Sequence, residues 1–251
     1  MALFECNIKS DVLELNVAVN VIIPQDVKKG EKLQAVYLLH GYIGNHTDWC
    51  RYSSVERYAW EHRFAIIMPG VNNSYYSNTK FGQKYLDYVS IELPEIISRM
   101  FPISDKREDN FVCGLSMGGY GALRVALHNP KRFSKAASLS GAVNIDSIKK
   151  LVEDTPRKHF TNATFGEAST KDTENDLLYL IQTHQKNKQE LPNIYLACGT
   201  EDFLYKDNLE FKRALDHLKM PYTYEESKGD HNWAFWDEYL QKVLYWLEKK
   251  V

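Results

Sequence analysis

A G-x-S-x-G motif at residues 114–118 is the part of this sequence whose residue types and spacing point most directly to covalent chemistry. Residues 110–113 before it have the composition of a buried strand, and residues 119–128 after it have that of a helix. A serine at such a strand-to-helix turn projects its hydroxyl out of the sheet, and flanking glycines fit where side chains would collide. Free N–H groups at the start of the helix favour the negative charge of a tetrahedral intermediate. The motif predicts that Ser116 is a nucleophile; the alternative is a turn without chemistry.

A serine nucleophile needs a base and a group that orients the base. Ligands gather at the carboxyl ends of strands in an open α/β sheet, so candidates should directly follow strands. Asp202 and His231 each follow an apolar run, and the order serine, aspartate, histidine is that of α/β-hydrolases. His231 would take the serine proton, and Asp202 would hold the imidazole tautomer. Glu201 and Asp207 are nearby alternatives to Asp202, whereas Asp230 is expected to be a loop or cap residue.

An oxyanion hole requires two backbone N–H groups that point at the developing charge. One is expected from Met117, the residue after the nucleophile. The other is expected from the loop after the apolar run 35–39, and we assign it to Tyr42, with Ile43 as the alternative. His40, which precedes a glycine turn in this loop, is expected to make structural hydrogen bonds rather than to act as a second base.

The hydrophobic pattern predicts strands and helices that alternate along the chain. Residues 12–23 alternate between apolar and polar positions, which indicates a strand with one buried face that pairs antiparallel with residues 3–8. Six continuous apolar runs indicate parallel strands buried on both sides. These runs are 35–39, 64–68, 111–113, 133–139, 194–198 and 222–225, and the predicted helices are 53–62, 83–100, 119–128, 173–187, 207–218 and 233–249. We expect one α/β domain over residues 1–251, with a mostly parallel central sheet and helices on both faces.

One long polar segment, residues 144–172, interrupts this alternation. Long excursions in compact domains are often caps over a functional site, and a solvated surface loop with short helices is the alternative. Five aromatic residues near the predicted catalytic loops are candidates to line a substrate pocket or, alternatively, to belong to the core. They are Trp49, Tyr75, Tyr76, Phe203 and Trp233.

Composition excludes several other classes of function. A net charge of −2 over 251 residues gives no electrostatic reason to expect nucleic acid or an anionic membrane as a partner. No secretion signal or bilayer-spanning run is recognised, and the four cysteines lack metal-ligand spacing. No metalloprotease helix, P-loop or dinucleotide-binding turn is found, so we expect no metal and no cofactor. The missing secretion signal and the cysteine pattern favour a cytoplasmic, reduced protein.

Four motifs in register over nearly the whole chain resemble the esterase D-like branch of the α/β-hydrolases. They are Leu39-His40-Gly41, Gly114-Leu115-Ser116-Met117-Gly118-Gly119, Gly199-Thr200-Glu201-Asp202 and Gly229-Asp230-His231-Asn232-Trp233. That branch includes S-formylglutathione hydrolases, acetylxylan and feruloyl esterases, and mycolyltransferases. The sequence is most similar to tributyrin esterases of lactic acid bacteria and streptococci. The resemblance implies an α/β-hydrolase fold, a cofactor-free carboxylesterase that hydrolyses acetyl to butyryl esters of small molecules, and a homo-oligomer.

One departure weakens the assignment to S-formylglutathione hydrolases. Those enzymes carry a Gly-Leu-Thr-Cys pattern where this chain has Gly41-Tyr42-Ile43-Gly44. Deacetylation of sugars or xylan and acyl transfer to an alcohol remain alternative activities, because both would use Ser116, Asp202 and His231. An inactive hydrolase-fold module that binds a partner is the non-enzymatic alternative.

Overall fold

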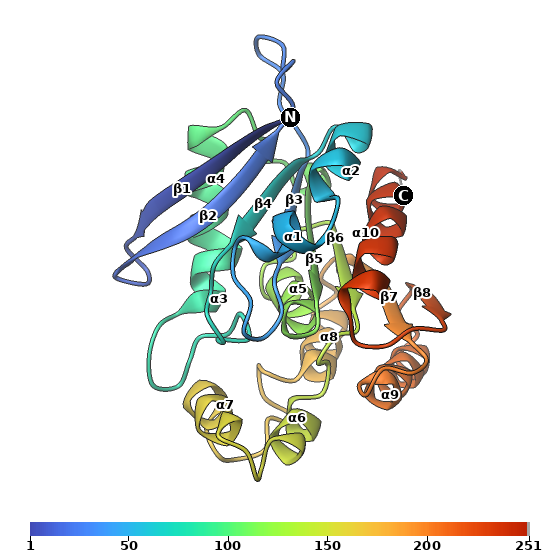
Figure 1. Ribbon diagram of the computed structural model, residues 1–251. Coiled ribbons are helices and arrows are strands. Elements are labelled where there is room, and N and C mark those ends of the chain that lie inside the picture. Colours follow the sequence, from blue (N-terminus) through green and yellow to red (C-terminus); the bar gives the residue numbers. More distant parts are fainter. Residues whose placement is uncertain (250–251) are drawn as a thin grey trace.

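The computed structural model describes residues 1–249, which form eight strands in one sheet (Figure 1). The strand order across the sheet is β1-β2-β4-β3-β5-β6-β7-β8. Strand β2 runs antiparallel to β1 and β4, and the other neighbours pair in parallel. The strands are β1 (Ala2–Ser10), β2 (Leu15–Ile23), β3 (Ala35–Leu39), β4 (Ala65–Pro69), β5 (Asn110–Leu115), β6 (Lys135–Leu139), β7 (Asn193–Gly199) and β8 (Tyr222–Ser227).

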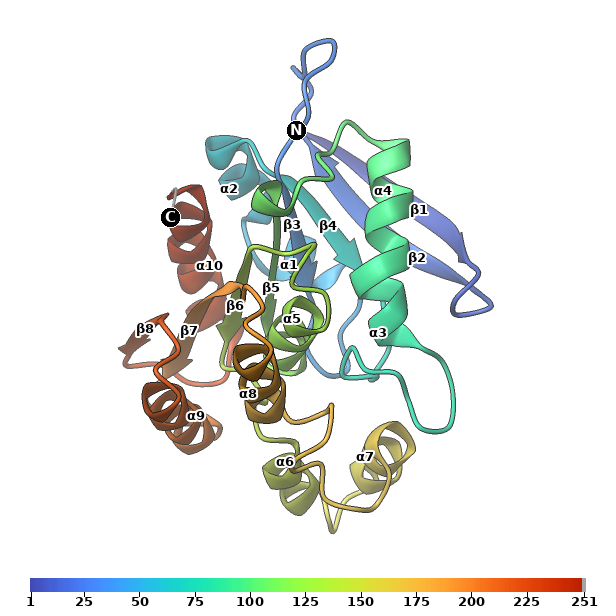
Figure 2. The same ribbon diagram turned by 180° about the vertical axis from the view of Figure 1, so that it is seen from behind.

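Helices cover both faces of this sheet. They are α1 (Asp48–Tyr52), α2 (Val55–His62), α3 (Tyr85–Asp87), α4 (Leu93–Met100), α5 (Met117–His128), α6 (Ile145–Leu151), α7 (Arg157–Phe165), α8 (Leu177–Lys186), α9 (Tyr205–His217) and α10 (Trp233–Glu248). Helices α1, α2 and α10 lie in front of the sheet in Figure 1, and α4, α5 and α8 lie on the other face, as Figure 2 shows from behind. The predicted mostly parallel sheet, antiparallel N-terminal pair and two helical layers are confirmed.

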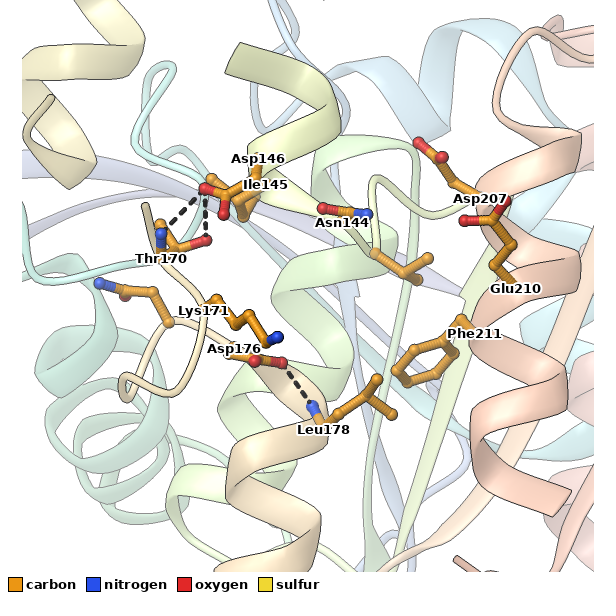
Figure 3. Close-up of a pocket in the computed structure, with 12 residues that line it drawn as sticks. Asn144, Ile145, Asp146, Thr170, Lys171, Asp176, Leu178, Asp207, Glu210 and Phe211 are labelled. Atoms are coloured by element: carbon orange, nitrogen blue, oxygen red, sulfur yellow. Dashed lines mark hydrogen bonds between the residues drawn. The ribbon is translucent and has the colours of Figure 1, made fainter. Parts of the chain in front are cut away.

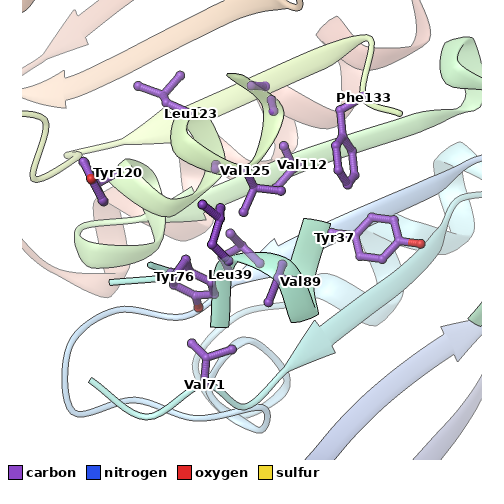
Figure 4. Close-up of a cluster of buried hydrophobic side chains, with 14 of the residues drawn as sticks. Tyr37, Leu39, Val71, Tyr76, Val89, Val112, Tyr120, Leu123, Val125 and Phe133 are labelled. Carbon is purple, nitrogen blue, oxygen red and sulfur yellow. The ribbon is translucent and has the colours of Figure 1, made fainter. Parts of the chain in front are cut away.

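The core consists of two clusters, one on each side of the sheet. Successive residues of a strand point to opposite faces, so Tyr37 belongs to one cluster and Leu38 to the other. Figure 4 shows part of the first cluster, where side chains of β3 and β5 meet those of α5. There the ring of Tyr37 contacts that of Phe133 edge to face, with 5.5 Å between centroids. Burial on both faces explains why these strands are continuous apolar runs.

The first antiparallel pair begins differently from the prediction. Residues 11–14 form a turn, so Leu13 is not part of a strand, although it is buried as the alternation indicated. The carboxylate of Glu92 holds this turn, since it accepts the N–H groups of Asp11 at 2.8 Å and Val12 at 3.2 Å. Glu92 ends a π-helical turn, Tyr88–Glu92, that lies between α3 and α4. A single helix was predicted there.

Two helices, α8 and α1, differ from the prediction. Helix α8 begins at Leu177 rather than at residue 173, because the Asp176 side chain accepts the Leu178 N–H and caps the helix. The short helix α1 was not predicted.

Residues 144–172 contain α6 and α7, which lie beyond the strands at one end of the sheet in both ribbon views (Figures 1 and 2).

Candidate active site

Ser116 occupies the sharp turn between β5 and α5. Its φ of 54° and ψ of −117° are unfavourable for a residue with a side chain. A Cβ on Gly114 would lie 2.2 Å from the Gly118 carbonyl oxygen, and a Cβ on Gly118 would lie 2.5 Å from the Leu39 carbonyl oxygen. Only glycine therefore fits at either position of the G-x-S-x-G motif. The Ser116 N–H donates to the Leu139 carbonyl at 2.9 Å, which ties the turn to β6.

The structure brings Ser116, His231 and Asp202 together, although they are far apart in the chain. The Ser116 Oγ lies 2.9 Å from His231 Nε2, and His231 Nδ1 lies 2.8 Å from the Asp202 Oδ2. The Asp202 side chain is fully buried, whereas that of His231 is 16% exposed. Because the Asp202 carboxylate accepts a hydrogen bond from Nδ1–H, the Nε2 lone pair faces the serine hydroxyl. This arrangement can move a proton from the hydroxyl to the imidazole.

Adjacent parallel strands bring the aspartate and histidine loops together. Asp202 follows β7 and His231 follows β8, and these two strands pair in parallel. The Glu201 N–H donates to the Gly229 carbonyl at 2.9 Å, which joins the two loops directly. A Cβ on Gly199 would lie 2.3 Å from the same carbonyl oxygen, so glycine is required for this close approach.

The other carboxylates near the histidine have different contacts. Glu201 lies 3.8 Å from the Lys228 ammonium, and Asp207 belongs to α9 and lines a different cavity. Asp230 Oδ1 accepts the backbone N–H of His231 at 2.7 Å, which is the loop role expected for it. Asp202 is thus the carboxylate that contacts the imidazole.

The backbone around Ser116 offers the N–H groups that an oxyanion hole needs. Within residues 1–249, the N–H groups of Tyr42 and Met117 donate no hydrogen bond to a protein acceptor. The Ile43 N–H instead donates to Asn73 Oδ1 at 2.7 Å, which favours Tyr42 over Ile43 as the oxyanion donor. Ile43 itself has a φ of 72°, which is unusual for a β-branched residue. The contact with Asn73 supports this strained loop.

His40 supports the same loop from the interior. Its Nε2 accepts the Val71 N–H at 3.2 Å, and its Nδ1 lies 2.8 Å from the Gly41 carbonyl. The Tyr76 hydroxyl donates to the His40 carbonyl at 3.0 Å. Burial lowers the pKa of His40 to about 4, so its ring is neutral at ordinary pH. His40 therefore makes structural hydrogen bonds, as expected.

The catalytic side chains open into a cleft of about 250 Å³. Two of the five predicted aromatic residues line it. The ring of Phe203 lies 4.5 Å from that of His231, and Trp233 contributes the second aromatic wall.

The other three predicted aromatics do not line this cleft. Trp49 is buried behind Trp233, with 5.1 Å between ring centroids, and its indole N–H donates to the Leu39 carbonyl. Tyr76 is completely buried, and Tyr75 packs between Tyr42 and Phe165. Their proximity to the catalytic loops in sequence reflects core packing, so assigning them to the pocket was wrong.

Besides Gly41 and Leu115, which belong to the two glycine motifs, three residues that line the cleft were not identified from the sequence: Asp48, Arg157 and Trp236. Trp236 could have been found, because it lies one helical turn after Trp233 and so shares its face of α10. Its ring contacts His231 edge to face, with 4.9 Å between centroids. Asp48 and Arg157 begin α1 and α7, and no motif in the sequence indicated that these helices reach the cleft.

A separate cavity of about 310 Å³ lies among α6, α8 and α9 (Figure 3). Two of its carboxylates already have local partners. Asp146 accepts the N–H of Thr170 at 2.8 Å, and Asp176 accepts the N–H of Leu178 at 2.9 Å. Among residues 1–249, its lining includes none of the three residues joined through His231. This cavity is distinct from the candidate active site.

Among residues 1–249, no three or more His, Cys, Asp or Glu side chains gather as potential metal ligands. Over the same residues, the helices are too short or too polar for any of them to span a bilayer.

Comparison with known proteins identifies the family. The family described as "Putative esterase" matches residues 10–247. An acetyl esterase of Caldicellulosiruptor saccharolyticus is 33% identical over 263 residues, which cover 99% of this chain and 99% of the relative.

Two solved structures from Staphylococcus aureus have the same fold. The fluorophosphonate-binding serine hydrolase F, with substrate bound, has a TM-score of 0.91 at 35% identity and covers 99% of both chains. An S-formylglutathione hydrolase without ligand has a TM-score of 0.88 at 35% identity and covers 98% of both chains. The chain therefore belongs to this esterase family, and it is an ester-hydrolysing enzyme with an α/β-hydrolase fold.

Proposed function

We propose that this enzyme hydrolyses short-chain acyl esters, acetyl to butyryl, through an acyl-enzyme intermediate on Ser116. The observation that carries the proposal is the pair of contacts that links Asp202 to His231 at 2.8 Å and His231 to Ser116 at 2.9 Å. These distances lie within the reach that general base catalysis requires.

In the first step the Ser116 oxygen forms a bond to the ester carbonyl carbon while its proton moves to His231 Nε2. The resulting oxyanion accepts hydrogen bonds from the N–H groups of Tyr42 and Met117. When the carbon–oxygen bond of the ester breaks, His231 returns the proton to the leaving alcohol. In the second half, a water molecule gives a proton to His231 and its oxygen bonds to the acyl carbon. The bond between this carbon and the Ser116 oxygen then breaks, His231 returns the proton to Ser116, and the acid leaves. Asp202 stabilises the imidazolium in both halves.

Short acyl chains are supported by the size of the cleft and by the acetyl esterase relative. A cleft of about 250 Å³ lies below the range of roughly 300–1,000 Å³ that is usual for drug-sized ligands. The rings of Phe203, Trp233 and Trp236 give it apolar walls. The resemblance to tributyrin esterases implies the same range of acyl lengths.

We also propose that the chain forms one domain in which residues 144–172 are a cap. Arg157 supports this proposal, since it belongs to that segment and lines the cleft.

The second candidate activity is S-formylglutathione hydrolysis, favoured by the 35% identity to the staphylococcal enzyme of that name. The absence of the Gly-Leu-Thr-Cys pattern at residues 41–44 argues against it.

A series of p-nitrophenyl esters from acetate to octanoate tests both the activity and the chain length. We expect kcat/KM to be highest from acetate to butyrate and to decline with longer chains, because the cleft is small. The Ser116→Ala variant should lose on the order of 10⁶ in kcat. Residual activity within tenfold of the wild type would refute Ser116 as the nucleophile. S-formylglutathione in the same assay tests the second candidate.

A further inference from the structure

Arg157 places a cation in the catalytic cleft that is not neutralised by a carboxylate. It lines the cleft together with Ser116 and His231, and its side chain is exposed. Among residues 1–249, no Asp or Glu oxygen lies within ion-pairing distance of its guanidinium. The neighbouring Lys158, by contrast, pairs with Glu153. The guanidinium of Arg157 is therefore exposed at the cleft without a carboxylate against it.

The position of Arg157 is fixed by aromatic packing. Its Cζ lies 4.9 Å from the centroid of the Tyr42 ring, which is a cation–π contact. The Tyr42 ring contacts Tyr75 at 5.9 Å, and Tyr75 contacts Phe165 at the other end of α7 at 5.4 Å. The Lys80 N–H also donates to the Thr164 carbonyl at 2.9 Å. Helix α7 is thus held against the loop that carries the proposed oxyanion donor.

Asp48 is the acidic side chain among the residues that line the cleft, and it forms no ion pair with Arg157. Its carboxylate lies against Gly44, where a Cβ would come within 2.2 Å of Oδ2. Burial raises the pKa of Asp48, while Arg51 and His46 act in the opposite direction. Burial outweighs both of these neighbours, so Asp48 is held on the α1 side with its carboxyl group against Gly44, and Arg157 remains a separate positive site.

We propose that Arg157 binds a carboxylate or phosphate group of the substrate, so that the enzyme prefers esters that carry a negative charge. A guanidinium is always charged, and its planar set of donors matches both anions in a two-pronged hydrogen bond. Contact with an aromatic face leaves its N–H edges free to bind a ligand. This inference rests on the proposed ester hydrolysis and names the class of substrate for that same site.

Matched pairs of esters test the inference and locate the charge. p-Nitrophenyl hemisuccinate and p-nitrophenyl butyrate differ by a carboxylate in place of the terminal methyl group on the acyl side, and each rate is corrected for hydrolysis without enzyme. The acetyl esters of 4-hydroxybenzoate and 4-hydroxybenzamide differ by a carboxylate on the alcohol side. The variant is Arg157→Gln, and the matched control is Arg57→Gln. Arg57 also lies over a tyrosine ring, at 5.1 Å from that of Tyr58, but it is outside the cleft.

We expect wild-type enzyme to prefer the charged member of at least one pair, and Arg157→Gln to lose on the order of tenfold in kcat/KM for it, mostly through KM. Any loss that Arg157→Gln causes through Tyr42 falls equally on both members of a pair, so the effect of the charge is read from the ratio of kcat/KM for the charged and the neutral ester. Arg57→Gln should leave this ratio as in the wild type. The pair that shows the preference identifies the side of the ester that carries the charge.

Two results would overturn the inference. One is the absence of any charge preference in the wild type. The other is an equal loss of kcat on charged and neutral esters in Arg157→Gln, which would mean that Arg157 acts only by positioning the Tyr42 loop. Failure of the proposed function looks different, because wild-type enzyme would then hydrolyse neither member of either pair.

Discussion

Ser116 is held in a backbone conformation that costs roughly 1–3 kcal/mol for a residue with a side chain. The surrounding contacts fix it there. Its N–H donates to β6 at Leu139, and its carbonyl accepts the N–H groups of Tyr120 and Ala142, each at 3.1 Å. These backbone contacts place the hydroxyl 2.9 Å from His231 Nε2. In the proposed mechanism this preorganisation removes the need to orient the nucleophile during the reaction.

At the same scale, His40 makes the stability of the protein depend on pH. Its pKa falls from 6.5 to about 4 on folding, so the unfolded chain binds more protons between these two values. The stability that comes from keeping this ring neutral is fully present above pH 6.5, and the free energy of unfolding decreases progressively as the pH falls toward 4. We expect this group to account for up to roughly 3 kcal/mol of the free energy of unfolding across that range.

Urea denaturation between pH 7.5 and pH 4 measures this effect. The His40→Gln variant should be less stable than the wild type at pH 7.5, and its stability should fall less steeply with acid. Parallel pH profiles for the two proteins would contradict the assignment of a neutral, buried imidazole.

At the scale of elements, the parallel pair β7 and β8 sets the distance between aspartate and histidine. Gly199 ends β7, and an added Cβ there would lie 2.3 Å from the Gly229 carbonyl oxygen, which belongs to the histidine loop. Neither the Gly199 backbone nor the Gly229 carbonyl can move away from this contact without moving the loop that follows it. We expect Gly199→Ala to displace Asp202 from His231 and to lower kcat by about a hundredfold.

Gly82→Ala is the control for this variant, because its Cβ would meet only the flexible Thr79 side chain, at 2.8 Å. It should keep wild-type kcat. Melting temperatures and kcat are measured for both variants. A Gly199→Ala enzyme with unchanged kcat would show that the approach of the two loops does not control the reaction.

The elements themselves were predicted well where both faces of the sheet are buried. The apolar run 35–39 corresponds to β3, Ala35–Leu39, without change, because every residue there packs on one of the two core clusters. The prediction was wrong where distant side chains decide the backbone. The turn at residues 11–14 depends on Glu92, about 80 residues away in the chain.

At the scale of the molecule, two features sufficed to predict which three side chains would meet. They are the order serine, aspartate, histidine along the chain and the position of each residue directly after a predicted strand. Parallel strands place their carboxyl ends at one edge of the sheet, so Ser116, Asp202 and His231 had to lie near one another. The strand order and the walls of the cleft could not be predicted, since both depend on packing between remote segments. Tyr76 was assigned to the pocket but is buried, and Arg157 reaches the cleft from a segment without a recognisable motif.

The central claim is that one serine in the whole molecule is activated by the histidine beside it. Treatment with a fluorophosphonate, followed by mass spectrometry of the intact protein and its peptides, tests this claim most directly. We predict one adduct per chain, located on the peptide that contains Ser116, and no adduct in Ser116→Ala. An adduct on another residue, labelling that persists in Ser116→Ala, or an esterase-active wild type that does not react would contradict it.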